Sequence, residues 1–223
     1  MLNMFSKKVS LFIAVALVVG CLADLVMLYF FGKQIPGYNQ FTSTISSLGE
    51  SSSPVAGAVT AWSVTLGIIF IFFGFAFRSV YYEYGIPTRF ASLLLIIYGI
   101  GENIASGVFK PDHINGALTF MAVLHGILGG IGVISALLLP FIMMKLFTRN
   151  SFPVFYVFSF FVLLTGLVSI LLFSFRVVYF ENSFVNTYKG LWQRIFLIDY
   201  YIYFAAIAFM MIKKVNVNAS VAK

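Results

Sequence analysis

The chain of 223 residues is 61% hydrophobic and only 9% charged, whereas a soluble domain usually has about 25% charged residues. Its apolar residues fall into long blocks, which excludes an ordinary soluble domain and predicts a membrane protein. The formal net charge is +7, but the basic residues gather at the ends of the apolar blocks, where they set topology rather than bind nucleic acid. The single cysteine, Cys21, excludes a disulfide framework and a multi-cysteine metal site.

Six apolar runs, each near the roughly 20 residues needed to cross a bilayer, predict six transmembrane helices. Short polar segments join the runs and no linker divides them, so we expect one domain over residues 1–223. The fold class expected is an all-α, six-helix transmembrane bundle, integral to the cytoplasmic membrane and multi-pass. The predicted spans are residues 10–31, 55–77, 90–109, 118–144, 154–175 and 195–212.

The first run begins like a lipoprotein signal, with basic residues before an apolar core and Gly20 directly before Cys21. The apolar run continues to Phe31, however, whereas the apolar core of a signal peptide is much shorter than a span. We therefore expect an uncleaved first helix that retains Cys21. Between the third and fourth spans, residues 110–117 are expected to form a tight turn, because Pro111 blocks helix continuation.

The distribution of Lys and Arg over the two ends of the spans predicts the orientation. One side holds nine basic residues and the other five, and the richer side is expected to be cytoplasmic, with both termini inside. The richer side holds Lys7, Lys8, Arg78, Arg89, Lys145, Arg149, Lys213, Lys214 and Lys223. The poorer side holds Lys33, Lys110, Arg176, Lys189 and Arg194.

Four ionisable residues lie inside the predicted spans, namely Asp24, Glu102, His125 and Asp199. Counted from the outer ends of their helices, they lie about 13, 12, 10 and 7 Å deep, in that order. The half-thickness of the hydrocarbon is about 15 Å, so all four are expected in its outer half. Ionisable groups at this depth are costly and are functional candidates by default.

The third and fourth spans are expected to pack as an antiparallel pair, because the connection between them is short. Glu102 and His125 lie at similar depth on faces rich in small residues, which permit close helix contact in lipid. We therefore expect these two side chains to lie close together, with Asp24 and Asp199 joining them from neighbouring helices. These four residues are the candidate catalytic groups.

The charge balance of this polar layer leaves three interpretations open. The spans contain three acids and no Lys or Arg, and bare carboxylates in a low-dielectric medium are unfavourable. The acids are protonated, or basic residues at the rim reach them, or the site holds a cation. In the first case they would simply join helices by hydrogen bonds.

The cofactor is left open, with a divalent metal ion as the candidate. Asp, Glu and His are suitable metal ligands, and the same four residues would supply them. No His-Glu-x-x-His pattern and no Gly-x-Ser-x-Gly nucleophile turn occurs in the sequence.

The outward-facing loops supply candidate substrate-binding residues. Arg194 and Lys110 lie at the rim, where they could meet an anionic lipid headgroup. Polar residues of the three outward-facing loops complete this set. The candidate substrate-binding residues are Arg194, Lys110, Asp112, His113, Ser46 and Gln193.

Four short motifs follow one another along the chain. They are Thr44-Ile45-Ser46-Ser47-Leu48-Gly49 before Ser53-Pro54, Gly107-Val108-Phe109-Lys110-Pro111-Asp112, Leu124-His125-Gly126 and Gly190-Leu191-Trp192-Gln193-Arg194. With them the chain resembles the bacterial and archaeal membrane family catalogued as domain of unknown function 998. The resemblance implies a multi-helix membrane fold and no settled activity, so it adds no catalytic residue.

The sequence leaves three functional classes open. The first is a membrane-embedded enzyme, hydrolytic or lipid-modifying, with acid–base or metal chemistry in the polar layer. The second is a small cation-coupled or proton-coupled carrier that uses the same acids, although six helices leave little for two gating halves. The third is a non-catalytic lipid-binding or helper subunit. Membrane lipids are the expected partners, nucleic acid is not, and the chain is a candidate homo-oligomer.

Overall fold

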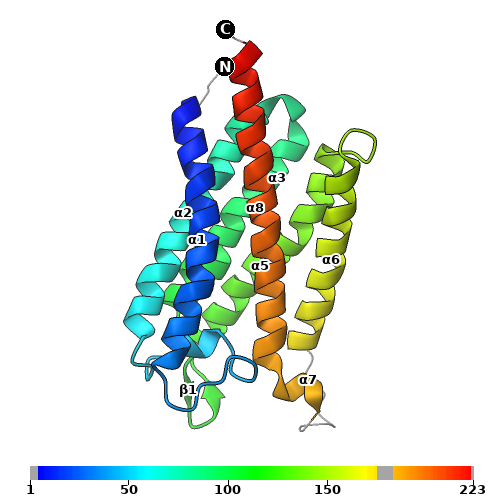
Figure 1. The fold of residues 1–223 in the computed structure, drawn as a ribbon. Helices are drawn as coiled ribbons and strands as arrows, with labels where there is room; N and C mark the ends of the chain where they lie inside the picture. Colours follow the sequence, from blue (N-terminus) through cyan, green and yellow to red (C-terminus); the bar gives the residue numbers. More distant parts are fainter. Residues whose placement is uncertain (1–4, 175–182, 222–223) are drawn as a thin grey trace.

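The computed structural model, which describes residues 5–174 and 183–221, is a bundle of long helices (Figure 1). Within these described residues, six helical segments are long and apolar enough to cross a membrane, which confirms the predicted all-α membrane bundle. They are α1 (Lys7–Lys33), α2 (Ala56–Val80), the composite third span Ile86–Val108, α5 (Phe120–Leu146), α6 (Pro153–Ser174) and α8 (Lys189–Val221). Phe175 of the predicted fifth span, and Arg176 and Lys223 of the charge count, lie outside the described residues.

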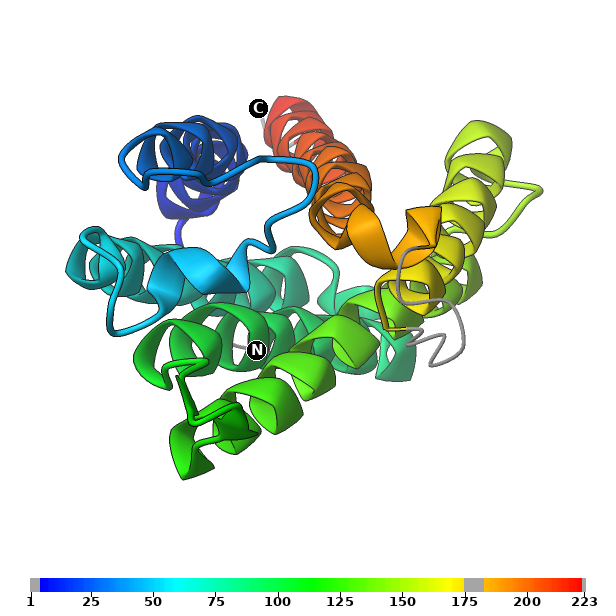
Figure 2. The ribbon, with the colours of Figure 1, turned by 90° about the horizontal axis from the view of Figure 1, so that it is seen from below.

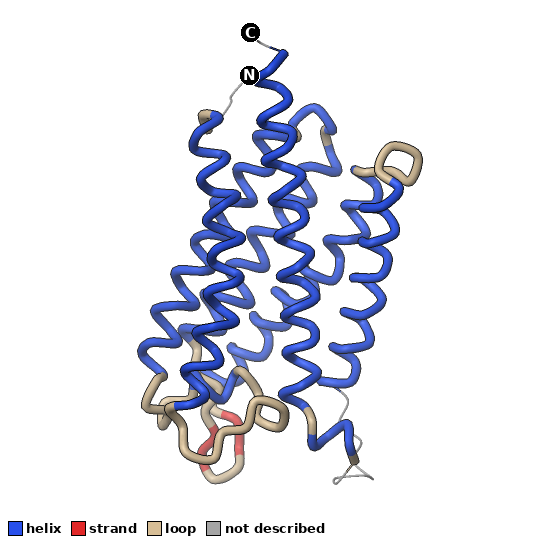
Figure 3. The backbone as a smooth tube through the Cα atoms, in the orientation of Figure 1, coloured by secondary structure: helices blue, strands red, loops and turns tan. Residues whose placement is uncertain are grey.

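The two ends of the bundle differ in character. Both termini lie at one end, together with the short helix η2 (Tyr82–Tyr84) (Figure 1). The opposite end carries the longer loops, the strands and the short helix α7 (Phe184–Thr187) (Figure 3). We call the first the termini end and the second the hairpin end.

The third span is not one continuous α-helix. It consists of α3 (Ile86–Tyr98), the π-helix η3 (Gly99–Ala105) and the short α4 (Ser106–Val108). Glycines let this segment approach its neighbours backbone to backbone. A Cβ on Gly99 would lie 2.7 Å from Gly67 O, and one on Gly101 would lie 2.5 Å from Leu128 O. The π-helical segment is therefore wedged between α2 and α5.

The connection after α4 is a small hairpin rather than a simple turn. Strands β1 (His113–Ile114) and β2 (Ala117–Leu118) pair in antiparallel register. Asn115 and Gly116 between them have φ values of 51° and 79°, as the type I′ hairpin turn requires. The expected tight turn is thus present, but it is ordered by strand pairing that we did not predict from the sequence.

The loop 34–53, which contains the short helix η1 (Ser46–Gly49), lies across the hairpin end and is attached to the start of α8. The Arg194 guanidinium donates to the Tyr38 hydroxyl at 2.7 Å, to the Gln40 side chain at 2.7 Å, and to Ser43 O at 3.0 Å. Residue Gln193 accepts a hydrogen bond from the backbone N–H of Ile45 at 2.7 Å. Figure 2 shows this loop crossing the helix ends.

The middle of the bundle is filled by aromatic side chains. The rings of Phe70, Tyr98 and Phe204 are almost fully buried and meet edge to face or tilted, with centroids 4.8 to 5.0 Å apart. Phe73 and Phe77 extend this packing along α2 toward the termini end.

Candidate functional site

A cavity of about 480 Å³ lies beneath the loop 34–53 at the hairpin end. Its walls come from η1, α2, η3, α4, α5, α6 and α8, so nearly every long element contributes to it. Most of the lining is apolar. The polar side chains that line it are Ser46, Ser63, Glu102, Ser106, His125, Ser174 and Gln193.

The oblique course of α5 makes room for this cavity. The last turns of α5 lie next to α6, to which they are joined by a short connection (Figure 1). The first turns of α5 lie well away from α6 when the bundle is viewed from the hairpin end (Figure 2). Because the two helices diverge, their facing sides remain as walls of the cavity. Gly126 and Gly130 of α5 line it, and a Cβ added at either would meet no atom within 4 Å.

Glu102 lies in the π-helix η3 and lines the cavity. Its carboxylate is held against the glycine face of α5, since a Cβ on Gly129 would lie 3.4 Å from Glu102 Oε2. Within the described ranges, no donor makes a hydrogen bond to this carboxylate. Short π-helical segments inside α-helices are frequent at functional sites. Glu102 is therefore an acidic group of the cavity that is available to a ligand.

The imidazole of His125 lies one helical turn before Gly129 on α5, about 6 Å along the axis. Its Nδ1 is 3.0 Å from both Ser106 O and Phe109 O. A carbonyl oxygen can only accept, so Nδ1 carries a proton and donates to the two carbonyls that end the third span. The described residues give Nε2 no partner. His125 thus presents one ring nitrogen to the backbone, and the other has no partner among the described residues.

Ser46 and Gln193 are the two rim candidates that the structure places at this cavity. The Gln193 side-chain oxygen is used by Ile45 N, which leaves its amide N–H groups for other contacts. The structure therefore brings together four of the residues expected from the sequence: Glu102, His125, Ser46 and Gln193.

Asp24 lies elsewhere in the bundle. Its side chain is only 6% exposed, and its two oxygens accept hydrogen bonds from Trp62 Nε1 at 2.6 Å and from the Tyr201 hydroxyl at 2.8 Å. These contacts join α1 to α2 and α8. Asp24 does not line the cavity, although it is close enough to Glu102 to interact with it electrostatically.

Asp199 also faces away from the cavity. Its carboxylate accepts a hydrogen bond from the Thr165 hydroxyl at 2.7 Å and so joins α8 to α6. The structure does not bring Asp199 to Glu102 and His125. The expected four-residue cluster is therefore divided into one pair in the cavity and two separate interhelical contacts.

The remaining rim candidates hold loops in place. The Lys110 amino group donates to Ala56 O at 3.3 Å, to Gly107 O at 3.4 Å and to the Thr60 hydroxyl. Partial burial lowers the pKa of Lys110, and the negative charge of Asp112 opposes that shift. Arg194 anchors the loop 34–53 through its contacts with Tyr38, Gln40 and Ser43.

Asp112 forms the second attachment of that loop. Its carboxylate accepts from the backbone N–H of Ser51 at 2.7 Å and from the Ser51 hydroxyl at 2.5 Å. These hydrogen bonds hold the pKa of Asp112 below its usual value. His113 is exposed on β1. Neither residue lines the cavity.

Comparison with known proteins places this chain in a family. A family model described as protein of unknown function (DUF998) matches residues 12–210, which includes most of every predicted span. The chain belongs to the DUF998 family. No curated protein and no solved structure matches it.

The four metal-ligand candidates of this DUF998 protein do not form one ligand set. Among the residues that the structure describes, no group of three or more His, Cys, Asp and Glu side chains lies together. Glu102 and His125 alone share the cavity.

Several groups of the DUF998 cavity were not predicted from the sequence. Ser63 of α2 lines it. Ser106 of α4 also lines it; its spacing from Glu102 predicts a shared helical face, but it was not among the candidate site residues. The π-helix itself was not predicted. Two glycines within three residues, Gly99 and Gly101, directly before an acid are the local signal that could have drawn attention to it.

Proposed function

We propose that the chain is a membrane-embedded enzyme that carries out acid–base chemistry on the polar end of an amphipathic, lipid-like molecule. One observation carries the proposal. A glutamate without a hydrogen-bond partner in the described part of the chain and a histidine with an available Nε2 share a largely apolar cavity at the end of a transmembrane bundle. Pockets with apolar walls and a few convergent polar groups are the usual form of small-molecule sites.

The apolar wall suits the chain of such a substrate. Val133, Ile134 and Leu137 of α5 face Ile170 and Phe173 of α6 across the cavity. Because α5 and α6 diverge toward the hairpin end, a lipid tail could lie between them while its polar end meets Glu102 and His125. Membrane lipids supply substrates of this shape at the required depth.

Ester hydrolysis is the simplest reaction that the pair supports. The Glu102 carboxylate takes a proton from water, whose oxygen bonds to the carbonyl carbon or phosphorus of the ester. The bond to the leaving oxygen breaks, and that oxygen keeps the electron pair and takes a proton from Nε2 of the His125 imidazolium. Transfer of the proton from Glu102 to Nε2 then restores both groups. The two carbonyls that accept from Nδ1 orient the ring.

The packing below the cavity supports an enzyme rather than a carrier. Tyr98 and Phe204 are 1% and 0% exposed, and Phe70 packs edge to face against both. This aromatic layer lies between the cavity and the termini end, so a substrate would enter and leave on one side. A carrier would need a second route through that layer.

Lipid turnover by the purified full chain tests the proposal. The chain is reconstituted into vesicles of the total polar lipid extract of its host cell, and lipid products are measured by mass spectrometry. We expect Glu102→Gln and His125→Asn to lower the rate of product formation at least about 100-fold. Asparagine at position 125 keeps a donor near the two carbonyls and removes the Nε2 proton donor. Glu83→Gln, a neutralised acid at the termini end, is the matched control and should leave the rate unchanged.

The thermal stability of each variant separates catalysis from packing. If His125→Asn lowers the melting temperature but leaves product formation intact, the histidine acts only as a helix cap and the proposal fails. It also fails if the wild-type chain converts no lipid of the extract. A carrier would instead move a radiolabelled solute or cation across the vesicle membrane without changing lipids.

A further inference from the structure

A second cavity, of about 740 Å³, lies at the termini end, far from the Glu102 site along the bundle axis. It runs between the first turns of α6 and the second half of α8, and Tyr81 and Tyr84 close its side. We call it the aromatic groove. It is lined by Tyr81, Tyr84, Phe147, Phe152, Pro153, Val154, Phe155, Phe158, Ala206, Phe209, Met210, Lys213, Lys214 and Val217.

The rings that form the groove support one another. Phe147 meets Tyr81 with centroids 5.4 Å apart and Phe155 with centroids 5.5 Å apart, in both cases edge to face. Tyr81 and Phe147 are 2% and 1% exposed. The floor of the groove is therefore preformed and apolar, and it suits a hydrocarbon chain rather than a polar ligand.

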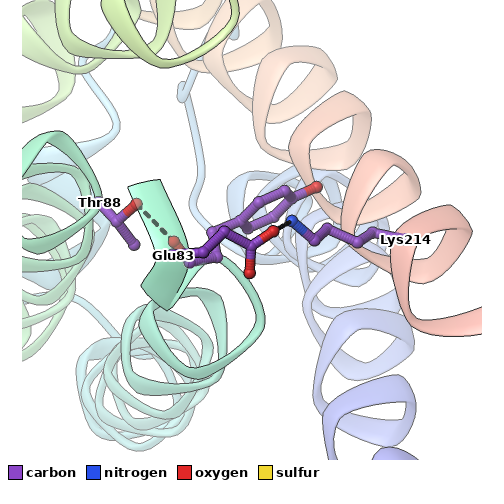
Figure 4. A network of polar contacts seen from close by, with 4 residues as sticks. Glu83, Thr88 and Lys214 are labelled. Atoms are coloured by element: carbon purple, nitrogen blue, oxygen red, sulfur yellow. Dashed lines mark hydrogen bonds and ion pairs between the residues drawn. The ribbon is translucent and has the colours of Figure 1, made fainter. Parts of the chain in front are cut away.

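Two lysines, Lys213 and Lys214, line the groove where it meets the termini end of the bundle. The Lys214 amino group is paired with Glu83 and lies 4.7 and 4.5 Å from the ring centroids of Tyr81 and Tyr84. Figure 4 shows the pair, together with the hydrogen bond that Thr88 donates to Tyr81 O at 2.8 Å. Lys214 is thus neutralised and fixed.

Lys213, the neighbouring residue, lines the same groove and is exposed. The described residues give its amino group no partner. The groove therefore ends in one uncompensated positive charge. Pro153, Val154 and Phe155 place the first turn of α6 at the groove as well, and the start of a helix carries partial positive charge.

The net charge of the whole termini end is also positive. Glu83 is its one acid in the described part of the chain, and Lys214 neutralises it. The basic residues of this end are Lys7, Lys8, Arg78, Arg89, Lys145, Arg149, Lys213 and Lys214. Clusters of Lys and Arg beside transmembrane helices attract anionic lipids, and each residue near the surface strengthens binding about fivefold.

We propose that the aromatic groove binds an anionic phospholipid. One acyl chain lies along the aromatic floor between α6 and α8, and the phosphate lies at Lys213 and the first turn of α6. The charge of the groove argues against a second copy of the chain as its occupant. Two copies in one membrane would bring their basic ends to the same level, where like charges repel.

Lipid retention by the purified full chain tests this site without any assay of turnover. The probes are phosphatidylglycerol and phosphatidylcholine with identical acyl chains, added to the chain in a neutral detergent. Native mass spectrometry reports the bound fraction of each. We expect phosphatidylglycerol to bind at least about fivefold more tightly than phosphatidylcholine.

Two pairs of variants locate the binding. Ala206→Phe fills the groove, whereas Ile202→Phe adds the same ring one turn earlier on α8, at an exposed position outside it. We expect the first to abolish retention of phosphatidylglycerol and the second to preserve it. Lys213→Gln should lower phosphatidylglycerol binding about fivefold, while Lys8→Gln, at the same end but outside the groove, should not.

Several results would overturn the site. Equal binding of the two lipids would show that the site does not recognise an anionic headgroup. Full retention of phosphatidylglycerol by Ala206→Phe would show that the lipid does not bind in the groove. A change of oligomeric state in Ala206→Phe would identify the groove as a contact between copies. If Ala206→Phe does not fold, Val154→Trp closes the groove from the opposite wall, at a position that is 83% exposed.

Discussion

The residues His125 and Asp24 show how differently two polar groups at membrane depth are used. His125 donates from Nδ1 to two carbonyls at 3.0 Å and keeps Nε2 unpaired among the described residues. Asp24 has both oxygens occupied, by Trp62 and Tyr201. An acceptor with two short hydrogen bonds joins helices, whereas a ring with one unused nitrogen remains available to a substrate. Depth alone therefore does not identify a site residue.

The sequence could predict the depth of these residues but not their partners. Counting residues from a helix end gives the depth, and Glu102 and His125 do line one cavity. The rotation of each helix about its axis depends on contacts with other helices, such as those of α1 with α2 and α8 and those of α8 with α6. For this reason Trp62 and Thr165, the partners of Asp24 and Asp199, could not be inferred. The roles of all four residues in catalysis stay predictions.

The contact between Asp112 and Ser51 predicts a pH dependence for the attachment of the loop 34–53. The pKa of Asp112 is lowered chiefly by the hydrogen bonds from Ser51, and Lys110 and His113 act in the same direction. A carboxyl group with a depressed pKa contributes fully above its unfolded value of about 3.9, and the contribution is lost as pH falls through the lower folded value. We therefore expect the attachment to be unchanged from pH 7 to 5.

Hydrogen–deuterium exchange at the Ser51 backbone N–H measures this attachment. Asp112→Asn should speed exchange at Ser51 at neutral pH, because the amide is a weaker acceptor than the carboxylate. Glu50→Gln serves as the control, because Glu50 is next to Ser51 but makes no hydrogen bond to Asp112. Exchange that accelerates between pH 7 and 5 in the wild-type chain, beyond the intrinsic pH dependence of amide exchange, would contradict the assignment.

The helices themselves were the best-predicted elements. Long apolar runs produce long apolar helices, because a bilayer leaves the backbone few other ways to satisfy its hydrogen bonds. The π-helix η3 was not predicted, since it depends on contacts of Gly99 and Gly101 with two other helices. The hairpin after α4 was readable in principle, because Asn115-Gly116 is a strong signal for a two-residue turn.

Two glycines on α5 allow a matched test of how this helix serves the cavity. A Cβ on Gly130 would meet no atom within 4 Å, whereas one on Gly132 would lie 2.4 Å from the backbone nitrogen of Glu102. We expect Gly130→Ala to stabilise the chain by up to about 1 kcal/mol through helix propensity. Gly132→Ala should destabilise it by about 1 to 3 kcal/mol, because it forces α5 and η3 apart.

Thermal unfolding of both variants in the same detergent measures the difference. Gly132→Ala should also displace Glu102 and so impair the activity proposed for the cavity, while Gly130→Ala adds only one methyl group to its wall. Equal stability of the two variants would show that α5 and η3 do not pack as closely as the structure indicates.

At the scale of the whole molecule, the two ends of the bundle have separate chemical characters. The hairpin end carries the cavity of Glu102 and His125. The loop 34–53 covers this cavity and is held to the bundle by hydrogen bonds with Arg194 and Asp112. The termini end carries the aromatic groove and most of the basic residues. An aromatic core between them, around Phe70, separates the two sites. The proposed acid–base site and the proposed lipid-binding groove therefore lie at opposite ends of the bundle.

The same division predicts the orientation in the membrane. Basic residues beside transmembrane helices are retained on the cytoplasmic side, and the end that carries eight of them in the described chain also carries both termini. We therefore expect both termini in the cytoplasm and the Glu102 cavity opening toward the outer face.

Reporter fusions at the C-terminus and within residues 51–53 distinguish the two orientations, because one reporter is active only in the cytoplasm and another only outside it. The C-terminal fusion should report a cytoplasmic position and the loop fusion an external one. Reversing the charge bias, by replacing Lys7 and Lys8 with Gln and adding Lys residues to the loop 34–53, should increase the inverted fraction. An external C-terminus in the wild-type chain would place the aromatic groove at the outer leaflet and would contradict this orientation.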